Sequence, residues 1–438
     1  MAPSLTWLTW PPGFWFRPAP PRKTATRLFH LPPELIRHII GFLEDDEQAL
    51  RATSLVASAF RRPAQEILFS ELLLEPPYPA PKHFAPGEKL LSLFEQSPEI
   101  AGYVRSIFIL DTPLLAYESA SWVCNDVQLP EALGRVSLDK IQAFTLHQGR
   151  RYSWSVLSAP MKDTILAICN SPSLVSLSIA GPPIDIIHVC RPSLKNLDIG
   201  NGTPHRLSNI STSMQRNASL KLQSLSLVRD HDVHEAVDYI LNPFNRIDVG
   251  ELETLCVFAS EIEDHDAMSS LLTECAASLH ALTFQPASNI AAHYITNEEN
   301  PFTLTGLVNL RRLTICYQHV FVDANNVDDP LPWVVDLLRT MQAPNILESV
   351  HLFVNHDFAD ADTHEPQRAE GWRELHSLLV DRKRFPALQH ADIELGSHNL
   401  DIDEIYDRVE GFLPDLDSIG LVRLKKMSSG LCGPDSVC

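Results

Sequence analysis

A short apolar pattern returns along most of the chain and restricts the folds open to it. Eleven segments have the form Φ-x-x-Φ-x-Φ, where Φ is an apolar residue, with a mean spacing of about 31 residues. They are VRSIFI (from Val104), IQAFTL, LVSLSI, LKNLDI, LQSLSL, LETLCV, LHALTF, LRRLTI, LESVHL, LQHADI and LDSIGL (from Leu416). Because side chains alternate along a strand, the last two Φ residues of each segment are predicted to point into a core.

Amphipathic helix candidates stand between these segments. They are MKDTILAIC, HEAVDYIL, HDAMSSLLTECAASL, LPWVVDLLRTM, EGWRELHSLLVDR and IDEIYDRVEGFL. A repeated helix–turn–strand unit buries its apolar face only by stacking on its neighbours. The pattern therefore resembles a divergent leucine-rich repeat, although the steps are irregular and the asparagine usual after the strand is mostly missing. A doubly wound α/β domain is the alternative, but it normally has longer strands and a glycine-rich binding turn, and the sequence has neither.

A different pattern occupies the amino-terminal part, in LPPELIRHIIGFLEDDEQALRATSLVASAF. Pro33 suits the first position of a helix, and Asp45 with Gln48 can form a capping box that starts a second one. Pro63 permits a third, short helix. So small a unit carries more large apolar side chains than its own core can cover, and the surplus predicts a partner surface.

This stretch resembles the F-box. Leu31, Pro32, Glu34 and Leu35 match the opening of that motif, and Val56 matches its valine. Ala57 replaces the cysteine, Phe60 the tryptophan, and Leu68-Phe69 the final Leu-Trp. The resemblance implies a three-helix module that docks on a Skp-type adaptor and, through it, on a cullin–RING ubiquitin ligase. A generic helical hairpin that caps a larger fold is the alternative.

Two sets of contact residues follow. The adaptor-binding residues are predicted to be Leu31, Pro32, Glu34, Leu35, Ile39, Leu43, Leu50, Val56 and Phe60. In the repeats, the residue between the last two Φ positions and the residue after them are predicted to point outward. The target-binding residues chosen from these two rows are Ser178, Asp198, Val228, Phe258, Thr283, Thr314, His351 and Phe353. Exposed Val228, Phe258 and Phe353 are predicted to form an apolar anchor.

Composition and motifs exclude several other functions. The net charge of −20 disfavours nucleic acid and anionic membranes as partners, and no apolar run is long enough to span a bilayer. The 8 cysteines form no CxxC pair and are predicted to be reduced, which favours a cytoplasmic or nuclear protein. No phosphate-binding, dinucleotide-binding, hydrolase or HExxH motif is present.

The remaining candidates for chemistry are weak. His231 and His234, in the acidic stretch 230–235, could share a metal, but the stretch is more typical of a polar loop before a helix. His188, two residues before Cys190, is only a weak signal for a reactive cysteine, and the negative charge of Glu274 disfavours a reactive thiolate at Cys275. We therefore predict no catalytic site, no metal and no cofactor.

These observations predict an α/β protein with a short three-helix F-box followed by a leucine-rich-repeat-like solenoid. The predicted divisions are a disordered arm (1–27), the F-box (28–75), a linker (76–100), the solenoid (101–424) and a flexible tail (425–438). The predicted function is that of a non-enzymatic substrate-recognition subunit of a Skp–cullin–F-box ubiquitin ligase, with an unknown protein target. A scaffold without a role in ubiquitylation and a diverged α/β hydrolase or transferase are the alternatives.

Overall fold

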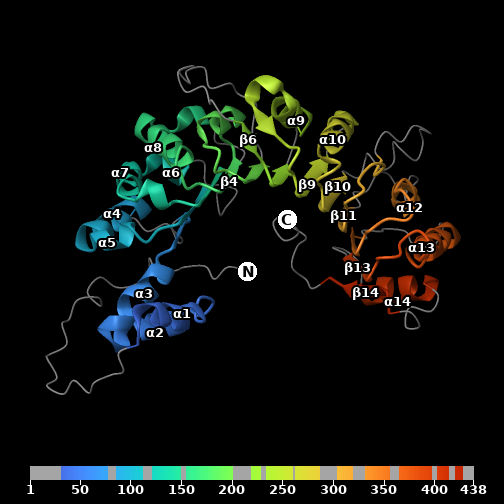
Figure 1. Ribbon diagram of the computed structural model, residues 1–438, viewed down its shortest axis with the longest axis horizontal. Helices are drawn as coiled ribbons and strands as arrows, with labels where there is room; N and C mark the ends of the chain where they lie inside the picture. Colours follow the sequence, from blue (N-terminus) through green and yellow to red (C-terminus); the bar gives the residue numbers. More distant parts are fainter. Residues whose placement is uncertain are drawn as a thin grey trace. The chain divides into compact units, whose positions relative to one another are not determined.

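The protein is an α/β structure of parallel strands and helices (Figure 1). The computed structural model describes residues 31–76, 85–111, 121–148, 154–200, 219–227, 233–259, 262–286, 303–318, 331–355, 365–396, 402–413 and 420–427. The chain divides into two compact units, the first ending at Leu194 and the second beginning at Lys195. This division falls inside the range 101–424 that was predicted as one domain. No helix in the described ranges has both the length and the apolar character needed to cross a bilayer.

The first unit pairs strands β1 to β4 in parallel and in chain order. Its strands are β1 (Glu71–Leu74), β2 (Ser106–Asp111), β3 (Ala143–Gln148) and β4 (Ser176–Ala180). Its helices are α1 (Pro33–Gly41), α2 (Glu47–Val56), α3 (Ser58–Leu68), α4 (Pro86–Gln96), α5 (Pro98–Ala101), α6 (Trp122–Asn125), α7 (Leu129–Gly134) and α8 (Ala159–Cys169), with 3-10 turns η2 (Leu138–Lys140), η3 (Trp154–Val156) and η4 (Ile184–Val189).

The second unit continues the same plan, with parallel pairs in the order β5, β7, β9, β10, β11, β12, β13 and β14. Its strands are β5 (Asn196–Gly200), β6 (Leu220–Lys221), β7 (Ser224–Leu227), β8 (Ile247–Asp248), β9 (Thr254–Ala259), β10 (Ala281–Pro286), β11 (Arg312–Gln318), β12 (Ser349–Asn355), β13 (His390–Gly396) and β14 (Val422–Lys426). Its helices are α9 (Val233–Leu241), α10 (Ile262–Cys275), α12 (Leu331–Arg339), α13 (Glu365–Leu379) and α14 (Ile402–Phe412), with the 3-10 turn η6 (Pro243–Asn245). Strands β6 and β8 form a separate parallel pair.

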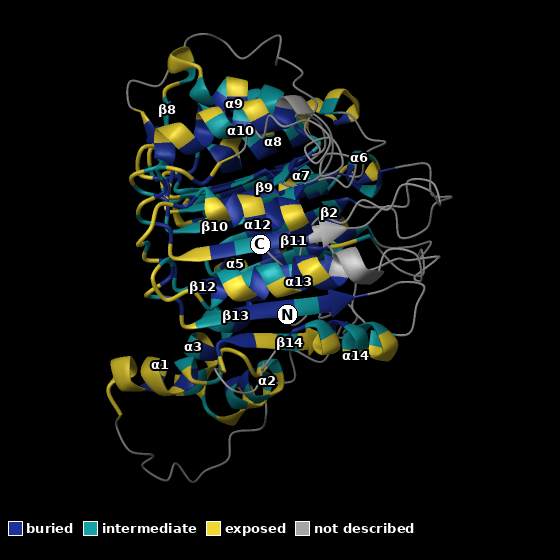
Figure 2. Ribbon diagram, turned by 90° about the vertical axis from the view of Figure 1, so that its right-hand side faces the viewer, coloured by how far each residue is buried: buried dark blue, intermediate teal, exposed yellow. Residues whose placement is uncertain are grey.

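Within each unit, the helices that follow the strands lie on one face of the sheet (Figures 1 and 2). All six helices predicted from the sequence are present, as α8, α9, α10, α12, α13 and α14. The strand order runs without reversal in each unit, whereas a doubly wound sheet reverses its order and carries helices on both faces. The doubly wound alternative is therefore wrong for both units.

The recurring Φ residues form ladders in the core. The first Φ residues Leu252, Leu279, Leu310 and Leu347 are all 0% exposed. The second Φ residues are paired in register from one strand to the next; they are Leu255, Leu282, Leu313, Val350, Ala391 and Val422. Burying one leucine side chain contributes about 1.5–3 kcal/mol, so each rung stabilises the pairing of adjacent strands.

Two predicted boundaries differ from the structure at the start of the sheet. Strand β1 lies within the range 28–75 assigned to the F-box, and it pairs with β2. Its sequence fits the same pattern, since Phe69, Leu72 and Leu74 are all buried. The predicted linker 76–100 contains helix α4, which packs on α7. Asp126 accepts hydrogen bonds from the amides of both helices, at 2.6 Å from Gly87 N and 3.1 Å from Leu129 N.

The last repeat is displaced from its predicted position. The segment LDSIGL was predicted to hold the final strand, but β14 begins at Val422, whose backbone lies opposite Ala391. The sequence IGLVRL, three residues later, has the same pattern and the observed register. Strand β14 also extends to Lys426, beyond residue 425, where the tail was predicted to begin.

Buried His265, on α10, makes stability depend on pH. Burial lowers the pKa of its imidazole from 6.5 to about 4, and the charge of Asp264 opposes the shift. Between these two pKa values the unfolded chain binds a proton that the folded chain does not. The contribution of the neutral His265 imidazole to the free energy of unfolding is therefore complete above about pH 6.5 and is lost as the pH falls toward about 4.

We therefore expect the free energy of unfolding to fall by about 2 kcal/mol from His265 alone between about pH 6.5 and about pH 5. Urea unfolding at the two pH values measures the loss. The variant His265→Leu is expected to lose correspondingly less stability over the same interval. Parallel pH dependence in the two proteins would contradict the assignment.

Candidate functional site

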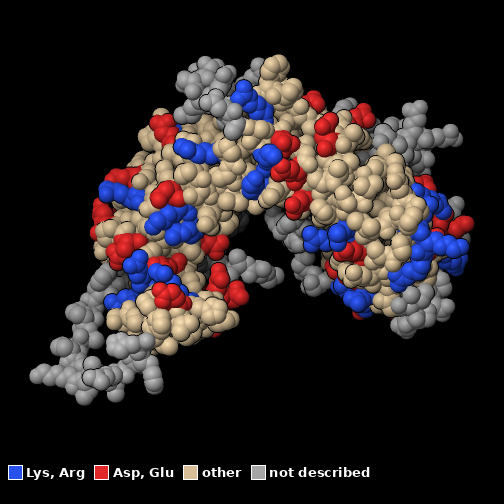
Figure 3. All heavy atoms as spheres, in the orientation of Figure 1, with Lys and Arg blue, Asp and Glu red and all other residues tan. Residues whose placement is uncertain are grey.

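Exposed apolar side chains are concentrated on α1 and α2. Half of the large apolar residues that are exposed in the described ranges lie in this short stretch. They are Leu31 (40% exposed), Leu35 (48%), Ile39 (51%), Phe42 (77%), Leu55 (72%) and Val56 (73%), and together we name them the helical apolar surface. Figure 2 shows exposed residues along α1, and Figure 3 shows mostly uncharged side chains over α1 and α2.

Helix α1 has apolar residues on two faces. Ile36 and Ile40 are 8% and 2% exposed and belong to the core of the three helices, whereas Leu35, Ile39 and Phe42 lie on a second face at i, i+4 and i+7. A single buried stripe would suffice for a helix that only packs on its own unit. The second stripe is therefore available to a partner.

Local interactions hold these helices in place. Helix α1 begins at Pro33, as predicted, but α2 is capped by Asp46, whose carboxylate accepts a hydrogen bond from Ala49 N at 2.8 Å. The predicted capping residue, Asp45, is thus one position too early. Pro63 lies inside α3 rather than at its start. Glu66 of α3 pairs with Arg37 of α1 at 3.6 Å, which links the first and third helices.

The predicted adaptor-binding residues divide into three groups. Six are exposed, namely Leu31, Pro32, Glu34, Leu35, Ile39 and Val56, and Leu43 and Phe60 are half-buried. Leu50 is only 2% exposed, so its prediction as a contact residue is wrong, because the helix turns it into the unit's own core. Phe42 and Leu55 were not predicted as contacts, although the i, i+7 spacing of Leu35 and Phe42 was available in the sequence.

The strand face is the sheet face opposite the helices. It carries, in register, the first of the two predicted rows, which consists of the residue between the last two Φ positions of each segment. In the second unit, one continuous line of paired backbone positions joins the strands; it runs through Asp198, Ser226, Cys256, Thr283, Thr314, His351 and Asp392. Each lies between buried neighbours and most are half-buried, as predicted, while Cys256 and Asp392 are 6% and 5% exposed. In the first unit, Ser178 lies on β4 and bonds to His147 of β3 at 2.8 Å.

The second row does not form a single apolar anchor. Phe258 and Phe353 are half-buried rather than exposed, and Val228 lies outside the described residues. Phe258 is on β9 and Phe353 on β12, three strands apart, which is about 14 Å at the usual strand spacing. They can therefore make two separate contacts.

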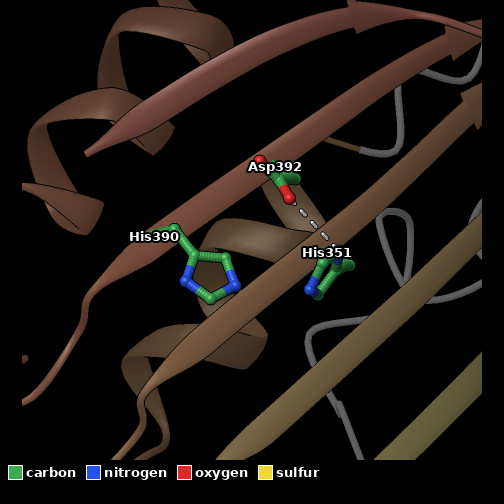
Figure 4. Close-up of side chains that lie close together, drawn as sticks. All are labelled: His351, His390 and Asp392. Carbon is green, nitrogen blue, oxygen red and sulfur yellow. Dashed lines mark ion pairs between the residues drawn. The ribbon is translucent and has the colours of Figure 1, made fainter. Parts of the chain in front are cut away.

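A group of ionisable side chains lies on the strand face at β12, β13 and β14. His351 Nδ1 is 3.7 Å from Asp392 Oδ2, and Lys425 Nζ is 2.9 Å from the same oxygen. His390 completes the group, with its ring centroid 5.6 Å from that of His351. Figure 4 shows His351, His390 and Asp392. Burial lowers the pKa of His351 below its ordinary value, and the Asp392 carboxylate opposes that shift. His351 was predicted to point outward from its place in the repeat, but its grouping with His390, Asp392 and Lys425 was not predicted.

The cysteines considered as nucleophiles are buried. Cys190 is 1% exposed and Cys275 0%, and burial raises the pKa of the Cys275 thiol to about 12. A thiol that stays protonated at neutral pH is a poor nucleophile. Cys124, Cys169, Cys190 and Cys275 are free thiols. Cys256 is disulfide-bonded, so the prediction of reduced thiols is wrong there.

Of the two histidines considered as metal ligands in 230–235, the structure describes only His234, which belongs to no group of three or more ligating side chains among the described residues. His234 is on α9, where its backbone N donates to Asp264 of α10 at 3.0 Å. His231 lies outside the described residues, so that part of the prediction is not described by the structure.

No protein-family model and no curated protein matches this chain. Two surfaces are the candidates for binding a partner: the helical apolar surface in the first unit and the strand face, with its rows of small, polar and aromatic side chains.

Proposed function

We propose that this protein is the substrate-recognition subunit of a Skp–cullin–F-box ubiquitin ligase. The observation that carries the proposal is the helical apolar surface, because a three-helix unit with a second, unburied apolar stripe matches the place where an F-box meets its adaptor. The repeats, which we assign to a divergent leucine-rich-repeat solenoid, hold a protein target on the strand face. The match of Leu31, Pro32, Glu34 and Leu35 to the F-box opening supports the assignment.

The mechanism is proximity. The receptor binds the adaptor with one surface and the target with another, which raises the target's effective concentration beside a ubiquitin-loaded enzyme. No group of the receptor reacts in this mechanism.

The adaptor contact is tested by Leu35→Asp. Burying an unpaired aspartate in an apolar interface costs at least about 2 kcal/mol, so adaptor affinity is expected to fall more than about 30-fold. Leu35 is 48% exposed, and the variant is therefore expected to fold. Calorimetric titration with a purified Skp-type adaptor gives the affinity, and circular dichroism checks the fold.

The matched control for this experiment is Phe244→Asp. Phe244 is 90% exposed and lies in η6 of the second unit, so the same kind of change is made away from the helical apolar surface. This variant is expected to bind the adaptor like the wild type. A folded Leu35→Asp protein with wild-type affinity would refute the adaptor assignment.

The second expectation is that the isolated chain forms no ubiquitin chains. Mixed with activating and conjugating enzymes but without a cullin–RING assembly, it offers no accessible thiol at Cys190 or Cys275 to carry ubiquitin. Immunoblotting for ubiquitin reports the result. Chains that form under these conditions, and disappear when one cysteine is replaced, would make the protein an enzyme instead.

The third expectation concerns the target. Phe258→Ala and Phe353→Ala are each expected to weaken target binding by about 1 kcal/mol or more, and their effects are expected to add because the residues are far apart. Quantitative affinity capture from cells compares the variants with Val308→Ala, which truncates an exposed side chain outside both rows. Adaptor binding is measured in parallel, since equal loss of both partners would indicate misfolding rather than a target contact.

A further inference from the structure

One cluster of two histidines and an aspartate on the strand face has no role in the proposed function. His351 of β12 and His390 and Asp392 of β13 each offer a ligand atom, and these atoms all lie within 4.8 Å of one another (Figure 4). We propose that His351, His390 and Asp392 bind a divalent transition-metal ion, with Zn²⁺ the best match. This inference does not depend on the proposed function.

The backbone sets these three side chains on the same face of the sheet. His390 and Asp392 are two residues apart on one strand, so both point to the same side. His351 lies directly opposite Asp392 on the neighbouring strand. Positions on paired strands are held by the ladder of backbone hydrogen bonds, so the cluster does not rely on a loop for its geometry.

The spacing is close to that of a metal site. Tetrahedral Zn²⁺ with ligands at about 2.0–2.1 Å places the ligand atoms about 3.4 Å apart. His351 Nδ1 and Asp392 Oδ2 are already 3.7 Å apart. The two imidazoles are half-buried and meet edge to face at an interplanar angle of 80°. Small rotations of these rings therefore suffice to bring the remaining atoms to coordination distance.

Asp392 supplies an independent indication of a cation-binding site. Its side chain is only 7% exposed, and Oδ1 accepts no hydrogen bond from any part of the chain that the structure describes. A buried carboxylate oxygen without a partner is costly. Metal coordination would satisfy this oxygen, because a carboxylate can bind through either or both of its oxygens.

Lys425 pairs with the proposed metal ligand Asp392, so a bound metal ion would compete with its ammonium group for this carboxylate. Its ammonium pairs with Asp392 Oδ2, but its side chain is 44% exposed and extends from the edge strand β14. A pair of this kind contributes little, and a long lysine side chain can move its charge into solvent. We therefore treat Lys425 as a competitor for the carboxylate, which gives the proposal a sharp test.

The donor set selects the class of metal. Two imidazoles and one carboxylate suit Zn²⁺ and neighbouring transition ions, whereas Ca²⁺ and Mg²⁺ prefer sites made of oxygen ligands. Three protein ligands leave a fourth position for water or a group from outside the chain. That position faces the same side of the sheet as Thr314 and Phe353.

The test is Zn²⁺ titration of the purified full chain, stripped of metal, in competition with a chromophoric chelator. We expect one tight site in the wild type, and His351→Ala and His390→Ala are each expected to weaken it at least about tenfold. Substitution of Co²⁺ adds a visible absorption band that reports tetrahedral coordination. His147→Ala, which removes a half-buried histidine from the strand face of the first unit, is the matched control and keeps wild-type affinity.

Lys425→Met completes the design. If the lysine competes with the metal, its removal raises Zn²⁺ affinity, and this result would separate a metal site from an ion pair with a purely structural role. The proposal is overturned if the wild type has no tight Zn²⁺ site or if Lys425→Met leaves the Zn²⁺ affinity unchanged. It is also overturned if His351→Ala and His390→Ala bind Zn²⁺ as tightly as the control His147→Ala. Adaptor binding, measured separately, tests the proposed function and does not enter this result.

Discussion

The contact between apolar side chains of successive strands is the interaction on which both units depend. Leu255, Leu282 and Leu313 follow one another in register and are at most 1% exposed. A strand of six or seven residues with one helix cannot bury these side chains alone, so every repeat is stabilised by its neighbours. A leucine-to-alanine change in such a ladder is expected to act on two interfaces at once.

This arrangement leaves the opposite face of the sheet free for other uses. Alternate residues of each strand are buried in the core. The residues between them face away from the helices, so they do not need large apolar side chains. The row from Asp198 to Asp392 is accordingly polar for the most part. It includes serine, threonine, histidine and aspartate, with Cys256 as the exception. Binding residues on such a face can change without disturbing the ladders, so we place both the proposed target contacts and the metal cluster there.

The three amino-terminal helices differ from the repeats in how their apolar side chains are buried. Their own core is small and uses Ile36, Ile40 and Leu50, yet more large apolar residues remain outside it than inside. Exposed apolar area of this extent is costly in water unless a partner covers it. The proposed docking of these helices on a Skp-type adaptor is based on this excess. The helical apolar surface and the strand face use different side chains and different secondary structure, so variants can be designed to disable one and preserve the other.

Local patterns in the sequence were sufficient for the repeat plan, for the six helices and for the alternation of buried and outward residues, because strand and helix periodicities depend on near neighbours. They failed where one pattern overlapped another, as at β1, whose Phe69, Leu72 and Leu74 were attributed to the end of the F-box. They also failed for Leu50, because the side of a short helix that becomes core is decided by the helices packed against it. The grouping of His351 with His390 and Asp392 required tertiary structure for a related reason. Residues about 40 positions apart become neighbours only through the register of β12 and β13, and that register is set by the buried ladder of Val350 and Ala391 on the other face of the same strands.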